Sequence, residues 1–224
     1  MSGASAPEAW LADLIGEVPG DMALYQQALT HGSASAAHYE RLEFLGDRVL
    51  GLIMSDWLFR RFPEEKEGQL SRRFNQLVAG DVCAQVARTI GVRNHLRLGK
   101  QARDDGAIDS DNVLGDAMEA LIGALYLDKG MEPARRFVER LWEPQVEGQS
   151  SAPKHPKSTL QEWAAANNRR PPDYALVDRS GPQHALRFKV SVTIKGAGEA
   201  RGEGSSKQEA ETAAAAALLE RLKG

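Results

Sequence analysis

The 224-residue chain contains a single cysteine, few aromatic residues and no long apolar segment. Because Cys83 has no partner, the chain cannot form an internal disulfide, and the surrounding DVCA lacks the paired spacing of a zinc site. We interpret Cys83 as a small buried hydrophobe rather than a nucleophile. No stretch reaches the roughly 18 uncharged apolar residues of a membrane span. We therefore expect a protein of a reducing compartment with no membrane partner.

Targeting signals and several common catalytic motifs are also missing. The opening MSGASAPEAW has neither the basic start nor the apolar run of a secretory peptide, which predicts a cytoplasmic location. No glycine-rich loop precedes Gly99-Lys100, so no nucleotide cofactor is expected. Ser55 lacks the flanking glycines of a nucleophile elbow, and no histidine pair has metal-binding spacing.

The two parts of the chain carry opposite net charge. Residues 1–150 hold 16 Lys and Arg against 23 Asp and Glu, a net charge of −7. Residues 151–224 hold 12 against 8, a net charge of +4. Such a split is expected when one part holds cations and the other approaches a polyanion.

A proline- and serine-containing segment, EGQSSAPKHPK at residues 147–157, has no apolar periodicity and indicates a linker. We predict a first domain over residues 1–148, a flexible linker over 149–156 and a second domain over 157–224. Hydrophobic residues make up 42% of the chain, which is enough for cores that need neither disulfides nor a structural metal.

Apolar periodicity predicts an all-α first domain. Helical spacing follows the acidic segment 40–47 and stops at Pro63. Residues 113–127 are apolar almost all round, which predicts a buried central helix ending near Gly130. Further helices are expected over residues 70–79, 81–90 with Asp81 as N-cap, and 133–142.

Downstream of the linker the period changes. A helix is expected over 158–166, strands over 174–179, 186–194 and 200–204, and a last helix from Ser206 to Leu222. The order α-β-β-β-α predicts an α+β domain in which a three-stranded sheet has both helices on one face. The third strand is weakly supported because it is rich in glycine.

Acidic residues gather on one predicted helix. Glu40, Glu43 and Asp47 lie at i, i+3 and i+7, so they project from one face. Charged residues at this spacing are usually a solvated face, and Glu40 alone fits that interpretation. Apolar residues at 42, 44, 45, 49 and 50 nevertheless indicate that the helix is at least half buried. Burying like charges is costly unless something positive sits among them.

A second acidic pair, Asp116 and Glu119, lies at i, i+3 within almost entirely apolar surroundings, so a solvated face is a poor explanation. If the two helices face each other, Glu43, Asp47, Asp116 and Glu119 form an all-oxygen site. Such ligands suit Mg²⁺ or Mn²⁺ rather than zinc or copper. A cation held there would suit phosphodiester hydrolysis.

These segments resemble the ribonuclease III family. ERLEFLGD at 40–47 resembles the signature of its first catalytic helix, and LGDAMEALIGALYLDKG at 114–130 resembles its second acidic helix. ALTH at 28–31 and PEEKEG at 63–68 also fall where family segments are expected. The resemblance runs from about residue 8 to the end.

The resemblance implies a set of site residues and a reaction. It implies that Glu43, Asp47, Asp116 and Glu119 are the metal ligands, with Asp47 and Glu119 most critical for cleavage. It places Glu40 and Glu67 at the dimer and substrate edge of the catalytic valley. It further implies a homodimer, Mg²⁺ (or Mn²⁺), products with 5′-phosphate and 3′-hydroxyl ends, and precursor ribosomal RNA among the substrates.

The basic part resembles a double-stranded-RNA-binding domain. Ser206 and Glu209 have capping-box spacing, which predicts a helix N-terminus. The positive charge of Lys207 in the first turn is unfavourable beside the positive end of the helix dipole. A bound phosphate, however, would be attracted both by the lysine and by the dipole. The resemblance assigns minor-groove contacts to Gln161, Glu162 and His184, which would read A-form shape and 2′-hydroxyls. Gln208 departs from the second basic residue common in the family, which suggests weaker phosphate binding.

Three functions compete at this point. The chain could be a ribonuclease III endonuclease, a non-cleaving RNA-binding protein of the same fold, or a di-metal redox protein. The complete acidic quartet favours the nuclease, because a binder has no need of buried carboxylates. Helical di-iron sites use Glu-x-x-His, whereas Gly46 and Ile122 stand three residues after Glu43 and Glu119.

Overall fold

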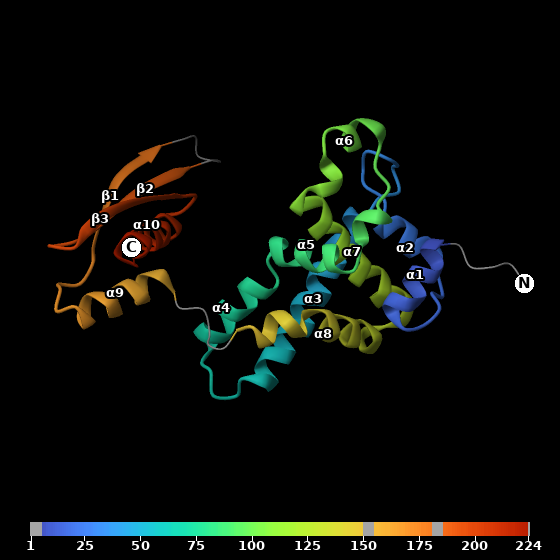
Figure 1. Ribbon diagram of the computed structural model, residues 1–224, viewed down its shortest axis with the longest axis horizontal. Coiled ribbons are helices and arrows are strands. Elements are labelled where there is room, and N and C mark those ends of the chain that lie inside the picture. The colour runs from blue at the N-terminus through green and yellow to red at the C-terminus, as the bar shows by residue number, and fades with distance from the viewer. Residues whose placement is uncertain (1–5, 150–154, 181–185, 224) are drawn as a thin grey trace, which may run out of the picture. The chain divides into compact units, whose positions relative to one another are not determined.

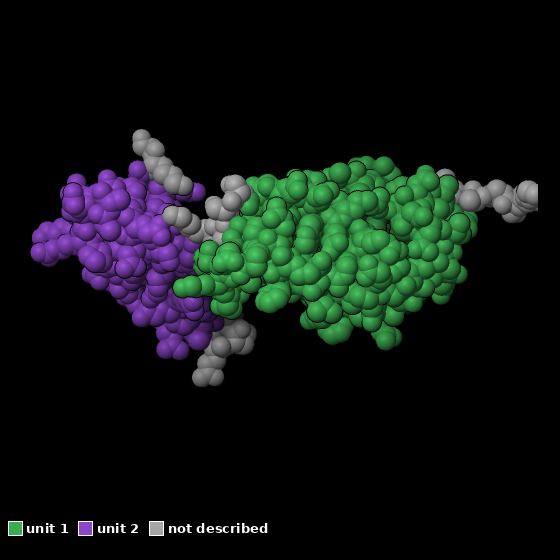
Figure 2. Space-filling model, turned by 90° about the horizontal axis from the view of Figure 1, so that it is seen from below, with its two compact units in different colours: residues 1–152 green, residues 153–224 purple. Residues whose placement is uncertain are grey.

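The computed structural model describes residues 6–149, 155–180 and 186–223 of the chain. The chain forms two compact units, residues 1–152 and residues 153–224 (Figure 2). The division falls inside the segment predicted as a linker, whose extent stays a prediction. Among the helices of the described residues, none combines the length and the apolar character needed to span a bilayer.

The first unit is helical, as its periodicity predicts. Its α-helices are α1 (Ala6–Ile15), α2 (Met22–Ala28), α3 (Glu40–Arg61), α4 (Glu67–Leu77), α5 (Gly80–Thr89), α6 (Lys100–Asp104), α7 (Asp111–Lys129) and α8 (Met131–Glu147). Two short 3₁₀ turns, η1 (Val92–Asn94) and η2 (Ala107–Asp109), complete it. The expectation of an all-α domain is confirmed.

Helix α7 occupies the interior of this unit, where α2, α3, α5 and α8 contact it (Figure 1). Its side chains are buried on nearly every face, from Val113 to Leu125. Gly130 ends the helix with φ of 85°, a conformation that glycine adopts without steric cost. The central buried helix predicted from the sequence is therefore present, and it carries Asp116 and Glu119.

Helices α4 and α5 each begin earlier than the sequence predicts. Helix α4 begins at Glu67 rather than at residue 70, because its polar first turn carries no apolar signal and the Gln69 side chain accepts the Lys66 N–H at 3.2 Å. The N-cap of α5 is Ala79, so the prediction that Asp81 caps this helix is wrong. Asp81 lies inside the first turn, where its carboxylate accepts the Val82 N–H at 2.9 Å.

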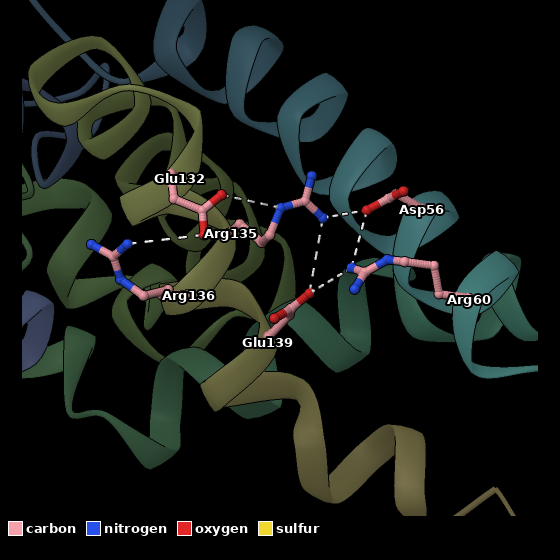
Figure 3. Close-up of polar contacts among 6 residues, drawn as sticks. All are labelled: Asp56, Arg60, Glu132, Arg135, Arg136 and Glu139. Carbon is pink, nitrogen blue, oxygen red and sulfur yellow. Dashed lines mark hydrogen bonds and ion pairs between the residues drawn. The ribbon is translucent and has the colours of Figure 1, made fainter.

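An ion-pair network joins the second half of α3 to α8 (Figure 3). Arg60 on α3 pairs with Glu139 on α8 at 3.1 Å, and Arg135 on α8 pairs with Asp56 on α3. Because these side chains are partly exposed, the ion pairs contribute little to the stability of the fold. We interpret them as fixing the rotation of α3 relative to α8.

The second unit has the predicted α-β-β-β-α order. Its elements are α9 (Pro156–Ala166), β1 (Asp173–Ser180), β2 (Arg187–Ile194), β3 (Gly198–Gly204) and α10 (Lys207–Lys223). The strands form an antiparallel sheet in the order β1-β2-β3. Helices α9 and α10 lie on the same side of the sheet (Figure 1), and Leu160, Val192 and Leu218 share one core.

The glycines that weakened the prediction of the third strand have a packing role. A Cβ added at Gly202 would lie 2.1 Å from the Ala214 backbone nitrogen. Helix α10 therefore packs its backbone directly onto β3, which only a residue without a side chain permits. Small residues on α10, such as Ala210 and Ala214, complete this close contact.

Candidate active site and RNA interface

Glycines bring the two acidic helices into close contact. A Cβ added at Gly46 on α3 would lie 1.7 Å from the Glu119 carbonyl oxygen on α7. A Cβ added at Gly123 on α7 would lie 2.3 Å from the Leu42 carbonyl oxygen on α3. The helices thus touch backbone to backbone within the stretches that carry the acidic residues, which places the two acidic pairs at one crossing.

The carboxylates at this crossing influence one another. Burial and the charges of Asp47, Asp116 and Glu43 together raise the pKa of Glu119 to about 7. Burial also raises the pKa of Glu43, with added repulsion from Asp116, Glu40 and Asp47. The structure therefore brings Glu43, Asp47, Asp116 and Glu119 into one electrostatic cluster. Its negative charge is costly to keep without a cation.

Asp116 and Asp47 have different hydrogen-bond partners. The Tyr39 hydroxyl donates to Asp116 Oδ2 at 3.4 Å. Burial raises the pKa of Asp116, while this hydrogen bond and the neighbouring His31 act in the opposite direction. The Asp47 carboxylate accepts a hydrogen bond from Arg48 Nη1 at 2.6 Å, and the Arg48 guanidinium lies over the Phe44 ring. Asp47 therefore has a cation of the protein itself beside it.

Cys83 on α5 contacts the same cluster, which the sequence did not indicate. The side chain is fully buried, as interpreted, and its Sγ lies 3.8 Å from Glu119 Oε1, to which it donates. Burial and the charge of Glu119 raise the pKa of the Cys83 thiol. The thiol therefore stays protonated and serves as a weak donor to Glu119. No local pattern signals this contact, because it depends on how α5 packs on α7.

The donor set of the cluster fits a hard divalent cation, because carboxylate oxygens are the ligands that Mg²⁺ and Mn²⁺ prefer. The raised pKa values of Glu43, Asp116 and Glu119 fit as well, since a bound cation would relieve the repulsion. Within residues 6–149, 155–180 and 186–223, however, no three His, Cys, Asp or Glu side chains are grouped as closely as a metal shell requires. Ion binding would therefore require some of these side chains to move closer together.

Glu40 and Glu67, assigned by resemblance to the edge of the valley, lie on different helices. Glu40 is 72% exposed and borders a hollow of about 760 Å³ that Phe44 and Leu127 also line. Glu67 begins α4, where its carboxylate accepts the Ser71 hydroxyl at 2.7 Å. Their roles at a dimer or substrate edge stay predictions.

The N-terminus of α10 differs in one detail from the predicted capping box. The Ser206 hydroxyl accepts the Glu209 N–H at 3.1 Å, as expected. The Glu209 carboxylate, however, accepts the Ser205 N–H at 2.8 Å and the Ser205 hydroxyl at 2.6 Å. The hydrogen bonds of the Glu209 carboxylate therefore go mainly to Ser205, one residue before Ser206.

The other residues assigned to RNA lie on the surface of the second unit, as far as the structure describes them. Gln161 and Glu162 are exposed on α9. The Lys207 side chain is 62% exposed, and its Nζ lies 3.9 Å from Glu211, which also pairs with Lys157 at 2.5 Å. His184 lies outside the described residues. The contacts of these side chains with RNA stay predictions.

Comparisons with known proteins match both units. Residues 21–145 match the family described as ribonuclease-III-like, and residues 156–222 match the double-stranded RNA binding motif. A protein named ribonuclease 3 from Zymomonas mobilis is 60% identical over 213 residues, which cover 95% of this chain and 87% of the relative. A ribonuclease 3 from Rhodobacter capsulatus is 47% identical, covering 88% and 87%.

The first unit is also similar in three-dimensional structure to solved nuclease domains. The nuclease domain of ribonuclease III from Campylobacter jejuni is 32% identical and superposes with a TM-score of 0.60. The match covers 63% of this chain and 97% of that domain. A second structure of the domain, described for flexibility in a region involved in dimer formation, is 33% identical with a TM-score of 0.59, covering 62% and 97%.

Proposed function

Because the chain belongs to the ribonuclease III family, we propose that it hydrolyses phosphodiester bonds in double-stranded RNA with Mg²⁺ held by four carboxylates. The ligands are Glu43, Asp47, Asp116 and Glu119, and Mn²⁺ is expected to substitute. The products carry 5′-phosphate and 3′-hydroxyl ends, and precursor ribosomal RNA is among the substrates.

The half-buried Glu119 carboxylate, crowded by three other acids, is the observation that carries this proposal. Its pKa is raised to about 7 by burial and by three neighbouring acids that come from two helices. A purely structural role gives no reason to bury an acid beside three others, since removing the charge would stabilise the fold. A divalent cation in the cluster would offset the cost.

The cluster's chemistry follows from what each group offers. A bound divalent ion supplies a water of lowered pKa and neutralises charge that develops on the phosphate. Glu119 must release its proton before it can bind a cation, so ion binding is favoured as the pH rises through about 7. The surrounding apolar side chains of α3 and α7 lower the local dielectric, which strengthens each of these charge interactions.

Removal of the metal tests the proposal directly. The full-length protein is expected to cleave long double-stranded RNA in Mg²⁺ and to lose that activity in excess chelator, with recovery when Mg²⁺ is restored. Gel electrophoresis of the products measures the cleavage, and end-labelling measures the 5′-phosphate. Cleavage that continues in chelator would contradict a metal-dependent reaction.

The outer face of α3 supports a homodimer. Phe44, Leu52 and Phe59 are spaced along one helical face and are 63%, 57% and 71% exposed. Large apolar side chains in such a row are typical of an interface between identical subunits. The hollow of about 760 Å³ beside Phe44 offers space for an apolar side chain of a second copy. The region involved in dimer formation in the Campylobacter jejuni nuclease domain is consistent with this proposal.

The second unit is proposed to hold the RNA backbone through the N-terminus of α10, with Gln161, Glu162 and His184 contacting the minor groove. Lys207 and Ser206 stand at the α10 terminus, where the helix dipole also attracts phosphate. The short Ser206 and Gln161 side chains suit contacts with 2′-hydroxyls rather than with base edges. Recognition is therefore expected to depend on duplex shape more than on sequence.

Neutralising Lys207 is expected to weaken binding uniformly across RNA sequences. The variant Lys207→Gln loses one phosphate contact, so the slope of log affinity against log salt should become shallower by about 1. Fluorescence anisotropy with duplexes of different sequence at several salt concentrations measures both effects. The control Lys195→Gln removes the same charge at the opposite end of β3 and should leave the slope unchanged. An unchanged slope for Lys207→Gln would exclude this lysine from the phosphate contacts.

A further inference from the structure

We propose that Tyr39 is a positioning residue that holds the Asp116 carboxylate in the orientation required for metal binding. This inference rests on the proposed function, because it concerns one of the four proposed ligands. Tyr39 immediately precedes α3, and its side chain is almost completely buried. Nothing in the acidic pattern of either helix assigns it a role.

The contact between the two residues is specific. The Tyr39 hydroxyl donates to Asp116 Oδ2 at 3.4 Å. Among the residues that the structure describes, Tyr39 is the one hydrogen-bond donor to this carboxylate, and Oδ1 accepts no hydrogen bond from them. One oxygen is thus tethered and the other is left for a ligand. Burial and the charge of Asp116 raise the pKa of Tyr39, so the phenol remains a donor at any ordinary pH.

Tyr39 is itself held by the segment before α3. Its backbone N–H donates to the Thr30 carbonyl at 3.0 Å, and the Thr30 hydroxyl donates to the Gln26 carbonyl at 2.6 Å. The Tyr39 ring packs edge-on against the His31 ring, with centroids 5.7 Å apart. The phenol therefore has little freedom to follow Asp116 if that side chain rotates, which is the property that a positioning residue needs.

The His31 ring that supports Tyr39 is also fixed. Its Nδ1 accepts the Ser33 N–H at 3.1 Å and lies 2.7 Å from the Ser33 hydroxyl oxygen. That oxygen accepts the Gly99 N–H at 3.0 Å, while the His31 backbone N–H donates to the Arg97 carbonyl at 2.9 Å. A continuous set of contacts thus leads from residues 97–99 through the 30–39 loop to Asp116.

A structural role alone explains the Tyr39 contact less well. At 3.4 Å the hydrogen bond is longer than the usual 2.7–2.8 Å or so for a hydroxyl donor, so its contribution to stability is small. Partners of metal ligands, by contrast, influence ion binding through orientation, and their loss typically costs about 10- to 100-fold in metal affinity or activity. The two roles therefore predict different experimental outcomes.

The variant Tyr39→Phe keeps the ring and its contact with His31 but removes the donor. Titration of the full-length protein with Mn²⁺ by isothermal calorimetry, without RNA, is expected to show a Kd about tenfold or more above that of the unmodified protein. The Mg²⁺ concentration for half-maximal cleavage should rise in parallel, and the rate at saturating Mg²⁺ should be largely restored. An unchanged Kd for Mn²⁺ would overturn the inference.

Tyr25→Phe is the matched control. The buried Tyr25 hydroxyl donates to Asp128 Oδ2 at 2.9 Å, so the variant removes a similar Tyr-to-Asp hydrogen bond outside the acidic cluster. It is expected to lower the Tm and to leave the Kd for Mn²⁺ unchanged. If both variants weakened Mn²⁺ binding equally, a general loss of stability would explain the result and the positioning role would be rejected.

The same titration separates this inference from the proposed function. If the unmodified protein does not bind Mn²⁺, the proposed metal site and the role of Tyr39 both fail. If Asp116→Asn abolishes Mn²⁺ binding but Tyr39→Phe does not change it, the site stands and only the role of Tyr39 fails. Binding that is lost with Asp116→Asn and weakened with Tyr39→Phe supports both.

Discussion

Replacing Glu119 by glutamine is expected to lower the rate of double-stranded RNA cleavage by about a thousandfold or more. A metal ion contributes several kcal/mol to transition-state stabilisation, and each ~1.4 kcal/mol corresponds to a factor of ten in rate. The amide keeps the shape of the side chain but removes the charge that the ion requires. Affinity for RNA should stay nearly unchanged, because Glu119 lies half-buried at the crossing of α3 and α7 and the phosphate contacts are assigned to the second unit.

The same variant should change stability in a pH-dependent way. The folded-state pKa of Glu119, about 7, lies above its ordinary value of 4.5, so the folded protein binds more protons between these values. Its stability without metal therefore decreases as the pH rises from about 4.5 to about 7. Glu119→Gln removes this loss, so its Tm in chelator should exceed that of the unmodified protein at pH 8 but not at pH 5.

Single-turnover cleavage, anisotropy with labelled duplex and thermal unfolding at both pH values measure these effects. Glu132→Gln, a charge-neutralising change on the exposed surface of α8, is the control and should cleave normally. Equal loss of cleavage and of RNA binding in Glu119→Gln would argue against a dedicated metal site. A Tm that is lower than normal at pH 8 would argue against an uncompensated buried charge.

Gly46→Ala is expected to destabilise the first unit strongly. The new Cβ would lie 1.7 Å from the Glu119 carbonyl oxygen, a backbone atom that cannot move aside by a rotamer change. Helices α3 and α7 would have to separate, at a cost of about 3 kcal/mol, the upper range for overpacking. For a unit of this size that corresponds to a Tm lower by about 6–12 °C. Separation would also displace Glu43 and Asp47 from Glu119, so the protein that remains folded should cleave poorly.

Gly51→Ala on the same helix is the matched control. Its Cβ would make an ordinary contact of 3.5 Å with the Phe74 ring. Alanine also favours a helix over glycine by about 0.5–1 kcal/mol, so this variant should be at least as stable as the unmodified protein. Thermal unfolding followed by circular dichroism compares the two. A Gly46→Ala protein with normal Tm and normal cleavage would show that the helices do not need this close approach.

Much of the fold could be predicted from local patterns in the sequence. The continuous apolar stretch predicted α7, and the alternation of apolar and polar residues predicted β2. Both patterns arise because buried positions are occupied by apolar residues. Boundaries were less accurate where side chains decide them. The prediction of Asp81 as a cap failed because the helix begins earlier, after Ala79, which has no side-chain acceptor, so Asp81 falls inside the first turn.

The sequence by itself determined the acidic residues, their helical spacing and the opposite charges of the two parts, since each of these depends only on residues close together in the chain. Only the tertiary structure decided which helix faces meet, through Gly46 and Gly123, and which neighbours reach the cluster. Tyr39 and Cys83 contact Asp116 and Glu119 across 77 and 36 residues of sequence. No local period encodes such contacts, because they arise when separate helices pack against each other.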